Sequence, residues 1–192
     1  MVLRIEGLDP LKMNEQKMQH VILFFLERIN NVHLGRVKLM KLLYYVDFDH
    51  FEKYGCSITG ARYRKLPHGP VPDKVDKVIE KMEKNKLVRA VNVQNTNFAR
   101  YRLIPVNGQF DASFFSGDEF AILETVACRW VDATAAEIEA ATHAEAPWAS
   151  TEETKAIDYE LAHYRSPLGE EPADKQLAGS AAFLGYVESL AS

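Results

Sequence analysis

The central element of the sequence is residues 36–54, RVKLMKLLYYVDFDHFEKY. Drawn as a helix, this segment shows apolar side chains on nearly every side. Such a helix is buried on several sides, whereas a surface helix keeps one polar face. Gly55 follows directly and suits the left-handed conformation found at helix ends. The pattern therefore predicts a central buried helix around which the rest of the chain packs.

Downstream of this helix, three prolines and a glycine shape residues 66–72, Leu-Pro-His-Gly-Pro-Val-Pro. Proline fixes φ at about −65° and keeps the residue before it out of a helix, whereas glycine opens positive φ. The segment is therefore predicted to reverse the chain between a strand over 61–66 and a helix that begins about Asp73, with Pro72 in its first turn. Two interpretations stay open: a stiff structural connector, or a rigid edge that a partner binds.

Apolar residues at helical spacing predict the remaining helices. They are expected at residues 14–30, 72–86 and 118–131. A further helix is predicted to start at a capping box of Thr134 and Glu137 and to end at Pro147–Trp148. Residues 157–164 fit either a helix or a strand.

Alternating patterns predict a small amount of β structure. The strand over 61–66 and a hairpin of residues 87–93 and 98–104, with turn residues at 94–97, are expected to form one three-stranded antiparallel sheet. The predicted fold class is therefore mainly α with a small antiparallel β-sheet (α+β), with a helical core around the central buried helix.

Length and composition indicate an ordinary globular protein. The chain has 192 residues, of which 47% are hydrophobic and 26% charged. We expect residues 1–165 to form one domain and residues 166–192 an acidic linker and a short C-terminal helix. The sequence shows no apolar run of the ~20 residues that span a bilayer, no export signal, and no pairing pattern for Cys56 and Cys128. A cytoplasmic protein without membrane contact is predicted.

Charge is distributed unevenly along the chain. Residues 36–104 hold 15 Lys and Arg against 7 Asp and Glu, while residues 105–192 hold 4 against 16. If the fold keeps these segments apart, their field steers charged partners, whereas interleaved segments neutralise one another.

The basic middle segment also allows a winged-helix-like DNA-binding regulator. The hairpin would act as its wing and carries Arg89, Arg100 and Arg102. Against this interpretation, the lysines of residues 72–86 alternate with Asp and Glu, and the pI is about 5.9. DNA is therefore the disfavoured partner.

The sequence contains no motif of a catalytic site. It has no phosphate-binding glycine loop, no serine nucleophile elbow and no histidine pair at zinc-binding spacing. Asp47 and His50 share a helix face beside Asp49, and they either ligate a metal or form an ordinary polar pair. We favour the polar pair, and we predict a protein without catalytic residues, metal or cofactor that is not an enzyme.

Six short motifs follow one another in a distinctive order. They are KLMKLLYY at 38–45, YG at 54–55, ITG at 58–60, LPHGPVP at 66–72, TAAEI at 134–138 and THAEAPW at 142–148. Over about residues 15–165 the chain thereby resembles the Panacea domain, the SocA-like antitoxin family of bacterial and phage toxin–antitoxin systems. The resemblance implies a mainly helical domain with a small sheet. It also implies an antitoxin that binds and silences a cognate toxin encoded beside it in the same operon.

The resemblance leaves the mode of action open. Members of the family serve unrelated toxins, and one branch acts as an adaptor that delivers its toxin to an ATP-dependent protease. We predict direct neutralisation by protein–protein binding. The stiff and aromatic motifs supply the predicted partner-binding residues, which are Tyr63, Leu66, His68, Gly69, Pro70, Val71, Pro72, His143 and Trp148. The alternative is a structural role, above all for Trp148, which would then pack against the core.

Overall fold

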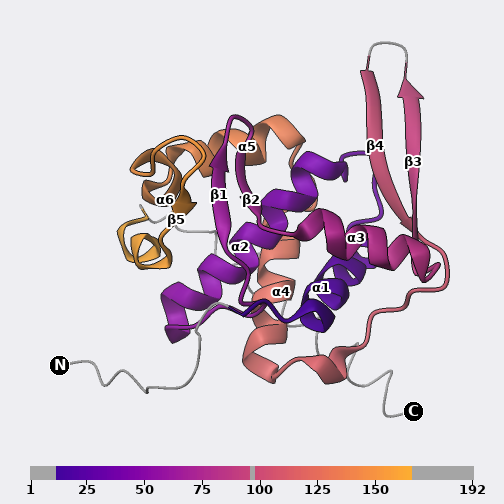
Figure 1. Ribbon diagram of the computed structural model, residues 1–192, viewed down its shortest axis with the longest axis horizontal. Helices are drawn as coiled ribbons and strands as arrows, with labels where there is room; N and C mark the ends of the chain where they lie inside the picture. The colour runs from indigo at the N-terminus through magenta and orange to yellow at the C-terminus, as the bar shows by residue number, and fades with distance from the viewer. Residues whose placement is uncertain (1–11, 96–97, 166–192) are drawn as a thin grey trace.

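The central helix is present as predicted. The computed structural model describes the backbone of residues 12–95 and 98–165 and the side chains of residues 12–92 and 101–165. Helix α2 spans Arg36–Tyr54, and every residue from 38 to 48 is buried. Gly55 ends the helix in the left-handed conformation, at φ 72°. In Figure 1, α2 crosses the middle of the molecule.

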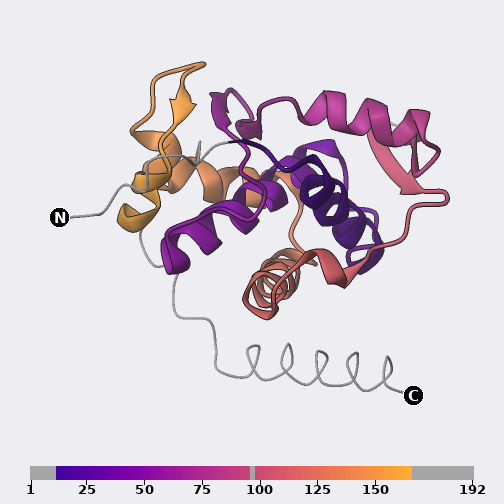
Figure 2. The same cartoon turned by 60° about the horizontal axis from the view of Figure 1, so that its bottom comes forward.

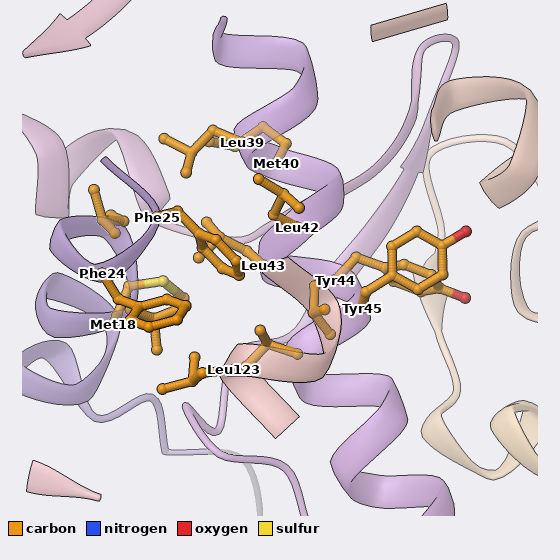
Figure 3. Close-up of a cluster of buried hydrophobic side chains, with 14 of the residues drawn as sticks. Met18, Phe24, Phe25, Leu39, Met40, Leu42, Leu43, Tyr44, Tyr45 and Leu123 are labelled. Carbon is orange, nitrogen blue, oxygen red and sulfur yellow. The ribbon is translucent and has the colours of Figure 1, made fainter. Parts of the chain in front are cut away.

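Two amphipathic helices pack against one side of α2. They are α1 (Glu15–Arg28) and α4 (Gly117–Trp130), and α4 begins with a capping box formed by Ser116 and Glu119. Figure 3 shows side chains of both helices facing the leucines of α2. Each large apolar side chain that is fully buried contributes about 1.5–3 kcal/mol. This cluster is therefore the main source of stability.

Helix α3 is shorter than the predicted segment 72–86. It spans Val75–Lys84 and buries the apolar face that the sequence predicts. Lys74 precedes it in the left-handed conformation, at φ 64°, and Pro72 belongs to a strand. The prediction that Pro72 opens this helix is therefore wrong, because the chain changes direction at Lys74 before the helix starts.

The proline segment forms a strand as well as a turn. Strands β1 (Tyr63–Leu66) and β2 (Gly69–Pro72) pair antiparallel, and residues 67 and 68 make the turn between them. Strand β5 (Ala156–Ile157) joins the other side of β1, so the sheet order is β2-β1-β5 and β2 is an edge strand. Proline is tolerated at an edge because a missing N–H breaks no ladder there.

The prediction that the long hairpin joins this sheet is wrong. Strands β3 (Val88–Asn95) and β4 (Phe98–Pro105) form a separate two-stranded sheet. Of the predicted turn, residues 96 and 97 lie outside the described residues. Buried Val88 and Leu103 fix the base of the hairpin, where β3 contacts α3 and β4 contacts α1. The hairpin therefore docks on helices, and Figure 1 shows it projecting well away from β1 and β2.

The last helices differ from prediction in their ends. After a short 3-10 turn, η1 (Ala112–Phe114), and α4, helix α5 (Ala135–Ala144) starts at the predicted capping box of Thr134 and Glu137. It does not continue to Pro147–Trp148, because Glu145 is extended and a separate helix, α6 (Ala146–Ala149), holds the proline in its first turn. Proline suits that position, since its missing N–H has no helical partner there.

Residues 157–164 contain both of the structures considered for them. Ile157 ends β5, and a 3-10 helix, η2, spans Tyr159–Tyr164. Tyr159 stacks on Phe48 of α2 with ring centroids 4.4 Å apart, and its hydroxyl donates to Ala61 O at 2.6 Å. The chain up to residue 165 is thereby tied to α2. Figures 1 and 2 show α5, α6 and β5 at one end of the molecule and the β3–β4 hairpin at the other.

The fold is mainly α with small antiparallel sheets, as predicted. A domain that ends at residue 165 stays a prediction, and the acidic linker and helix predicted for 166–192 lie outside the described residues. Within the described ranges, the search for a helix with the length and apolar character of a membrane span found none.

Candidate partner-binding site

The turn between β1 and β2 rests on buried polar side chains. Lys41 of α2 is 1% exposed, and its ammonium donates to Pro70 O at 3.1 Å. Burial lowers the pKa of Lys41 to about 8. Gly69 lies directly over it at φ 93°, where an added Cβ would be 2.6 Å from Lys41 Cε and 3.0 Å from Thr142 Oγ1. The β1–β2 hairpin therefore packs so closely on α2 and α5 that a side chain at position 69 would not fit.

Trp148 of α6 packs across the same hairpin. Its ring stacks on His143 with centroids 3.8 Å apart and an interplanar angle of 12°. Lys65 Nζ lies 4.0 Å from the ring centroid, and the indole N–H points to Leu66 O at 3.4 Å. Trp148 thereby joins β1 to α5 and α6 while staying half-buried.

His68 is the exposed tip of this arrangement. Its side chain is 77% exposed, and Nδ1 lies 3.2 Å from Glu139 Oε1 of α5. Lys65 Nζ, beside the Trp148 ring, donates to Thr151 O at 2.9 Å. We call the surface formed by Lys65, His68, Glu139, His143 and Trp148 the hairpin platform. It combines an aromatic centre with charges of both signs.

The structure brings most of the predicted partner-binding residues to this platform. Those at or directly beneath it are Leu66, His68, Gly69, Pro70, His143 and Trp148. Val71 and Pro72 lie at the other end of β2, opposite Arg64 and Tyr63. Leu66, Val71, His143 and Trp148 are half-buried, while Gly69, Pro70 and Pro72 are buried. Gly69 and Pro70 therefore shape the surface from below.

Tyr63 belongs to the core, and we leave it out of the contact surface. Its side chain is 0% exposed, and its hydroxyl lies 2.8 Å from both Leu43 O and Asp47 Oδ2. Burial raises the pKa of Tyr63 well above its usual value. Its neighbours in the chain are exposed: Arg62, which precedes β1, and Arg64, which belongs to it. A residue in this position cannot contact a partner without unfolding of the strand.

Buried Asp47 explains the Ile58-Thr59-Gly60 motif. Asp47 Oδ1 accepts from Thr59 N at 2.7 Å, and Oδ2 accepts from the Thr59 hydroxyl. Two neighbours of Asp47 in α2 have other partners. Asp49 lies 3.1 Å from Arg129, and His50 Nδ1 lies 2.6 Å from Cys56 O. The three side chains considered as metal ligands therefore have three different sets of partners.

A polar cluster at the junction of α5 and α6 was not predicted. Glu145 is 3% exposed, accepts from the Tyr44 hydroxyl at 2.8 Å and lies 3.8 Å from Arg165. Burial raises the pKa of Glu145 to about 7, because desolvation outweighs the attraction of Arg165. The sequence marks Glu145 only as the residue before Ala-Pro at a helix boundary. It gives no sign that Arg165 returns to the same place.

We predict that Glu145 makes the protein less stable as the pH rises. Its pKa in the folded state, about 7, lies above the ordinary value of 4.5. The folded state therefore holds the proton more tightly, and this stabilisation is complete below pH 4.5 and lost as the pH rises through 7. Urea unfolding should show a loss of about 3 kcal/mol over that range, and Glu145→Gln should remove it. The exposed control Glu152→Gln should keep the wild-type slope, and an unchanged slope in Glu145→Gln would contradict the prediction.

The lysines and acids of α3 occupy opposite flanks of its buried face. With 3.6 residues per turn, the alternating charges segregate into a basic flank of Lys77, Lys81 and Lys84 and an acidic flank of Asp76, Glu80 and Glu83.

The acidic flank of α3 is the one that faces the β3–β4 hairpin. Asp76 pairs with Arg36, and Glu83 accepts from Ala90 N of β3. On the basic flank, Lys81 pairs with Glu15 of α1 at 2.6 Å. The lysines of α3 and the hairpin therefore do not form one continuous basic face of the winged-helix kind. The predicted Arg100 lies outside the described side chains, and DNA binding stays untested.

In a comparison with protein families, residues 39–149 match the model described as Antitoxin SocA-like, Panacea domain. The matched range is more than half of the chain and contains most of α2 and the whole hairpin platform. Searches of curated proteins and of solved structures gave no match. The ordered motifs, the helical core and this match lead to one conclusion: the chain belongs to the SocA-like antitoxin family and carries its Panacea domain.

Proposed function

We propose that the protein is an antitoxin that neutralises a toxin from the same operon by direct binding, with the hairpin platform as contact surface. Both proteins would act in the cytoplasm. Family membership supports the antitoxin role. The observation that carries the choice of surface is His68, 77% exposed at the tip of a hairpin whose backbone three prolines restrict.

The rigidity of the platform favours binding. Ordering a flexible side chain at an interface costs about 0.5–1.5 kcal/mol. Here the order exists before the partner arrives, because Lys41 and Thr142 support Gly69 from below and His143 holds the Trp148 ring. A partner therefore meets a surface whose shape is already fixed.

The chemistry of the platform suits a protein partner. Trp148 offers a half-buried aromatic face at its centre, and aromatic residues are enriched among the residues that dominate binding energy. The exposed His68 and the partly exposed Glu139 lie at its edge, while Lys65 is buried against the ring. This arrangement of an apolar centre and a polar rim is typical of protein–protein interfaces.

The proposal can be tested by substitutions that leave the fold intact. His68→Glu replaces the exposed imidazole at the tip of the β1–β2 hairpin with a carboxylate. Trp148→Phe keeps an aromatic ring but removes part of its face. Each should weaken binding of the toxin from the neighbouring gene by about tenfold or more and reduce growth rescue on co-expression. Calorimetric titration of the purified toxin with each purified variant measures the affinity, and circular dichroism verifies the fold of the variant.

A matched control removes an exposed apolar side chain far from the platform. Val106 is 52% exposed just after the β3–β4 hairpin, so Val106→Ala should bind the toxin as the wild type does. Wild-type affinity in both His68→Glu and Trp148→Phe would refute the platform as the contact surface. Toxin half-life, measured with and without the ATP-dependent protease, tests the mode: neutralisation by occupancy leaves the half-life unchanged, whereas an adaptor shortens it.

A further inference from the structure

The C-terminal half of α2 and the junction of α5 and α6 surround the side chain of Arg165 with a site made of carboxylates and tyrosines. We call it the Arg165 pocket, and it is lined by Tyr44, Tyr45, Asp49, Glu52 and Glu145. Figure 3 shows Tyr44 and Tyr45 pointing away from the leucine cluster of α2, toward the later part of the chain. The pocket is therefore a polar region on the side of α2 opposite its main apolar contacts.

Arg165, directly after η2, inserts its side chain into this pocket. The side chain is only 7% exposed, and Nη2 lies 2.8 Å from Asp49 Oδ1 and also contacts Glu52. Nη1 lies 3.8 Å from Glu145 Oε2. One guanidinium thus faces three carboxylates. Asp49 also pairs with Arg129 at 3.1 Å and Glu52 is 42% exposed, so loss of Arg165 would affect the buried Glu145 most, since a buried carboxylate that loses its cation is poorly tolerated.

The fit of Arg165 is incomplete. Among the described residues, three buried side-chain polar atoms of this pocket and of Trp130, which stacks on Tyr45, have no hydrogen-bond partner: Asp49 Oδ1, Trp130 Nε1 and Arg165 Nε. Asp49 Oδ1 is close to Arg165 but not in hydrogen-bond geometry. A well-seated arginine binds a carboxylate through two parallel N–H bonds. Arg165 makes no such paired contact, so the pocket has acceptors that a guanidinium in another orientation would use better.

We propose that this pocket is a guanidinium-binding site that Arg165 fills in the free protein and that an arginine side chain of a bound partner protein takes over. The pocket adjoins the hairpin platform, since Glu145 lies between His143 and Trp148 in the chain. Its mouth is at the surface, where the side chain of Glu52 is 42% exposed and that of Tyr164 is 74% exposed.

A partner's arginine fits the pocket better than free arginine does. The α-carboxylate of the free amino acid would add a negative group next to Asp49, Glu52 and Glu145. An arginine within a peptide chain has no such group. The site does not depend on the partner being a toxin, so its test uses small probes and is independent of toxin neutralisation.

The first experiment empties the pocket and refills it in the full-length chain. Arg165→Ala should lower the thermal unfolding midpoint by about 5 °C. N-acetyl-L-arginine N-methylamide at about 20 mM should restore at least half of that loss. Methylammonium chloride at the same ionic strength should restore none of it. If Arg165→Ala does not fold, Arg165→Gln, which keeps part of the aliphatic stem, serves for the same measurement.

Matched variants separate the pocket from a general effect of the probe. Arg64→Ala removes an arginine from an exposed ion pair with Asp73, so the capped arginine should not stabilise it. Adding Asp49→Asn to Arg165→Ala should abolish the rescue. In the wild type, apparent binding of the capped arginine should be at least about tenfold weaker than in Arg165→Ala, because Arg165 competes for the site.

Three results would overturn the proposal. One is no rescue of either Arg165 variant by capped arginine. Another is equal rescue by methylammonium, which would indicate a site for any cation. The third is binding of free L-arginine more tightly than capped arginine, which would identify a metabolite site instead of a site for a partner protein.

Discussion

Replacing Gly69 with alanine is expected to lower the free energy of unfolding by about 3 kcal/mol. Two effects add. At φ 93°, an L-residue is strained, and its Cβ would lie 2.6 Å from Lys41 Cε and 3.0 Å from Thr142 Oγ1. The end of a lysine side chain moves easily at a surface, but Lys41 is buried and donates to Pro70 O. Relief of the clash would therefore break the contact that holds β2 on α2.

Two other glycines separate these effects. Gly55 has φ 72° with nothing near an added Cβ, so Gly55→Ala measures backbone strain alone and should cost about 1 kcal/mol. Gly117 opens α4 with free space around it, and Gly117→Ala should change the stability by less than about 0.5 kcal/mol. Urea unfolding of the three variants gives the comparison. Equal losses at Gly69 and Gly55 would show that the close contact with Lys41 contributes nothing.

The helical part of the fold follows from local signals. Residues 36–54 are apolar on every side, and α2 has those bounds. The capping box of Thr134 and Glu137 predicts the start of α5 correctly, because it satisfies backbone N–H groups with side chains a few residues away. Such interactions are contained within one short segment, so the sequence is enough to predict them.

The β structure does not follow in this way, because pairing depends on distant segments. Prolines suggested that residues 69–72 form only a turn, but an edge position lets them form β2. The third strand of that sheet comes from Ala156–Ile157, which has no strong strand signal. The long hairpin was expected to supply strands to the same sheet, and its contacts with α1 and α3 take it elsewhere.

The candidate site was predicted in part, for a similar reason. The proline motif and the His143–Trp148 segment were both singled out, and the stack of Trp148 on His143 joins them. Tyr63 was placed at the contact surface because it is aromatic, although the alternation with Arg62 and Arg64 already favoured an inward side chain. Buried Lys41 carries no signal in sequence, since a lysine in a helix is normally solvated. Arg165 likewise becomes relevant only when η2 folds back on α2.

Replacing Asp47 with alanine is expected to lower the free energy of unfolding by about 4 kcal/mol, the largest effect that we predict. Asp47 is 0% exposed and accepts from the backbone N–H and the hydroxyl of Thr59. Alanine would leave both donors buried without an acceptor and would release the Ile58-Thr59-Gly60 turn from α2. The Tyr63 hydroxyl is a smaller part of the loss, because Leu43 O remains beside it.

A comparison of Asp47→Asn with Asp47→Ala shows whether Asp47 stabilises the turn as a hydrogen-bond acceptor or through its charge. Burial raises the pKa of Asp47, so the ionised form is already disfavoured. Asp47→Asn keeps an acceptor oxygen for Thr59 N and should therefore cost only about 1 kcal/mol. As a control for loss of a carboxylate, Asp76→Ala removes an exposed partner of Arg36 and should cost less than about 1 kcal/mol. A loss in Asp47→Asn as large as that in Asp47→Ala would show that the charge, not the acceptor, holds the turn.

A double-mutant cycle tests whether Thr59 is the group that needs Asp47. Thr59→Val removes the hydroxyl donor and keeps the shape of the side chain. In the Thr59→Val background, Asp47→Ala therefore no longer leaves a hydroxyl donor unpaired. The combined loss should then fall short of the sum of the single losses by about 1 kcal/mol or more. Additive losses would mean that the two side chains stabilise the protein independently. In that case Asp47 would hold the motif through its bond to the Thr59 backbone N–H, which Thr59→Val leaves intact, and not through the hydroxyl.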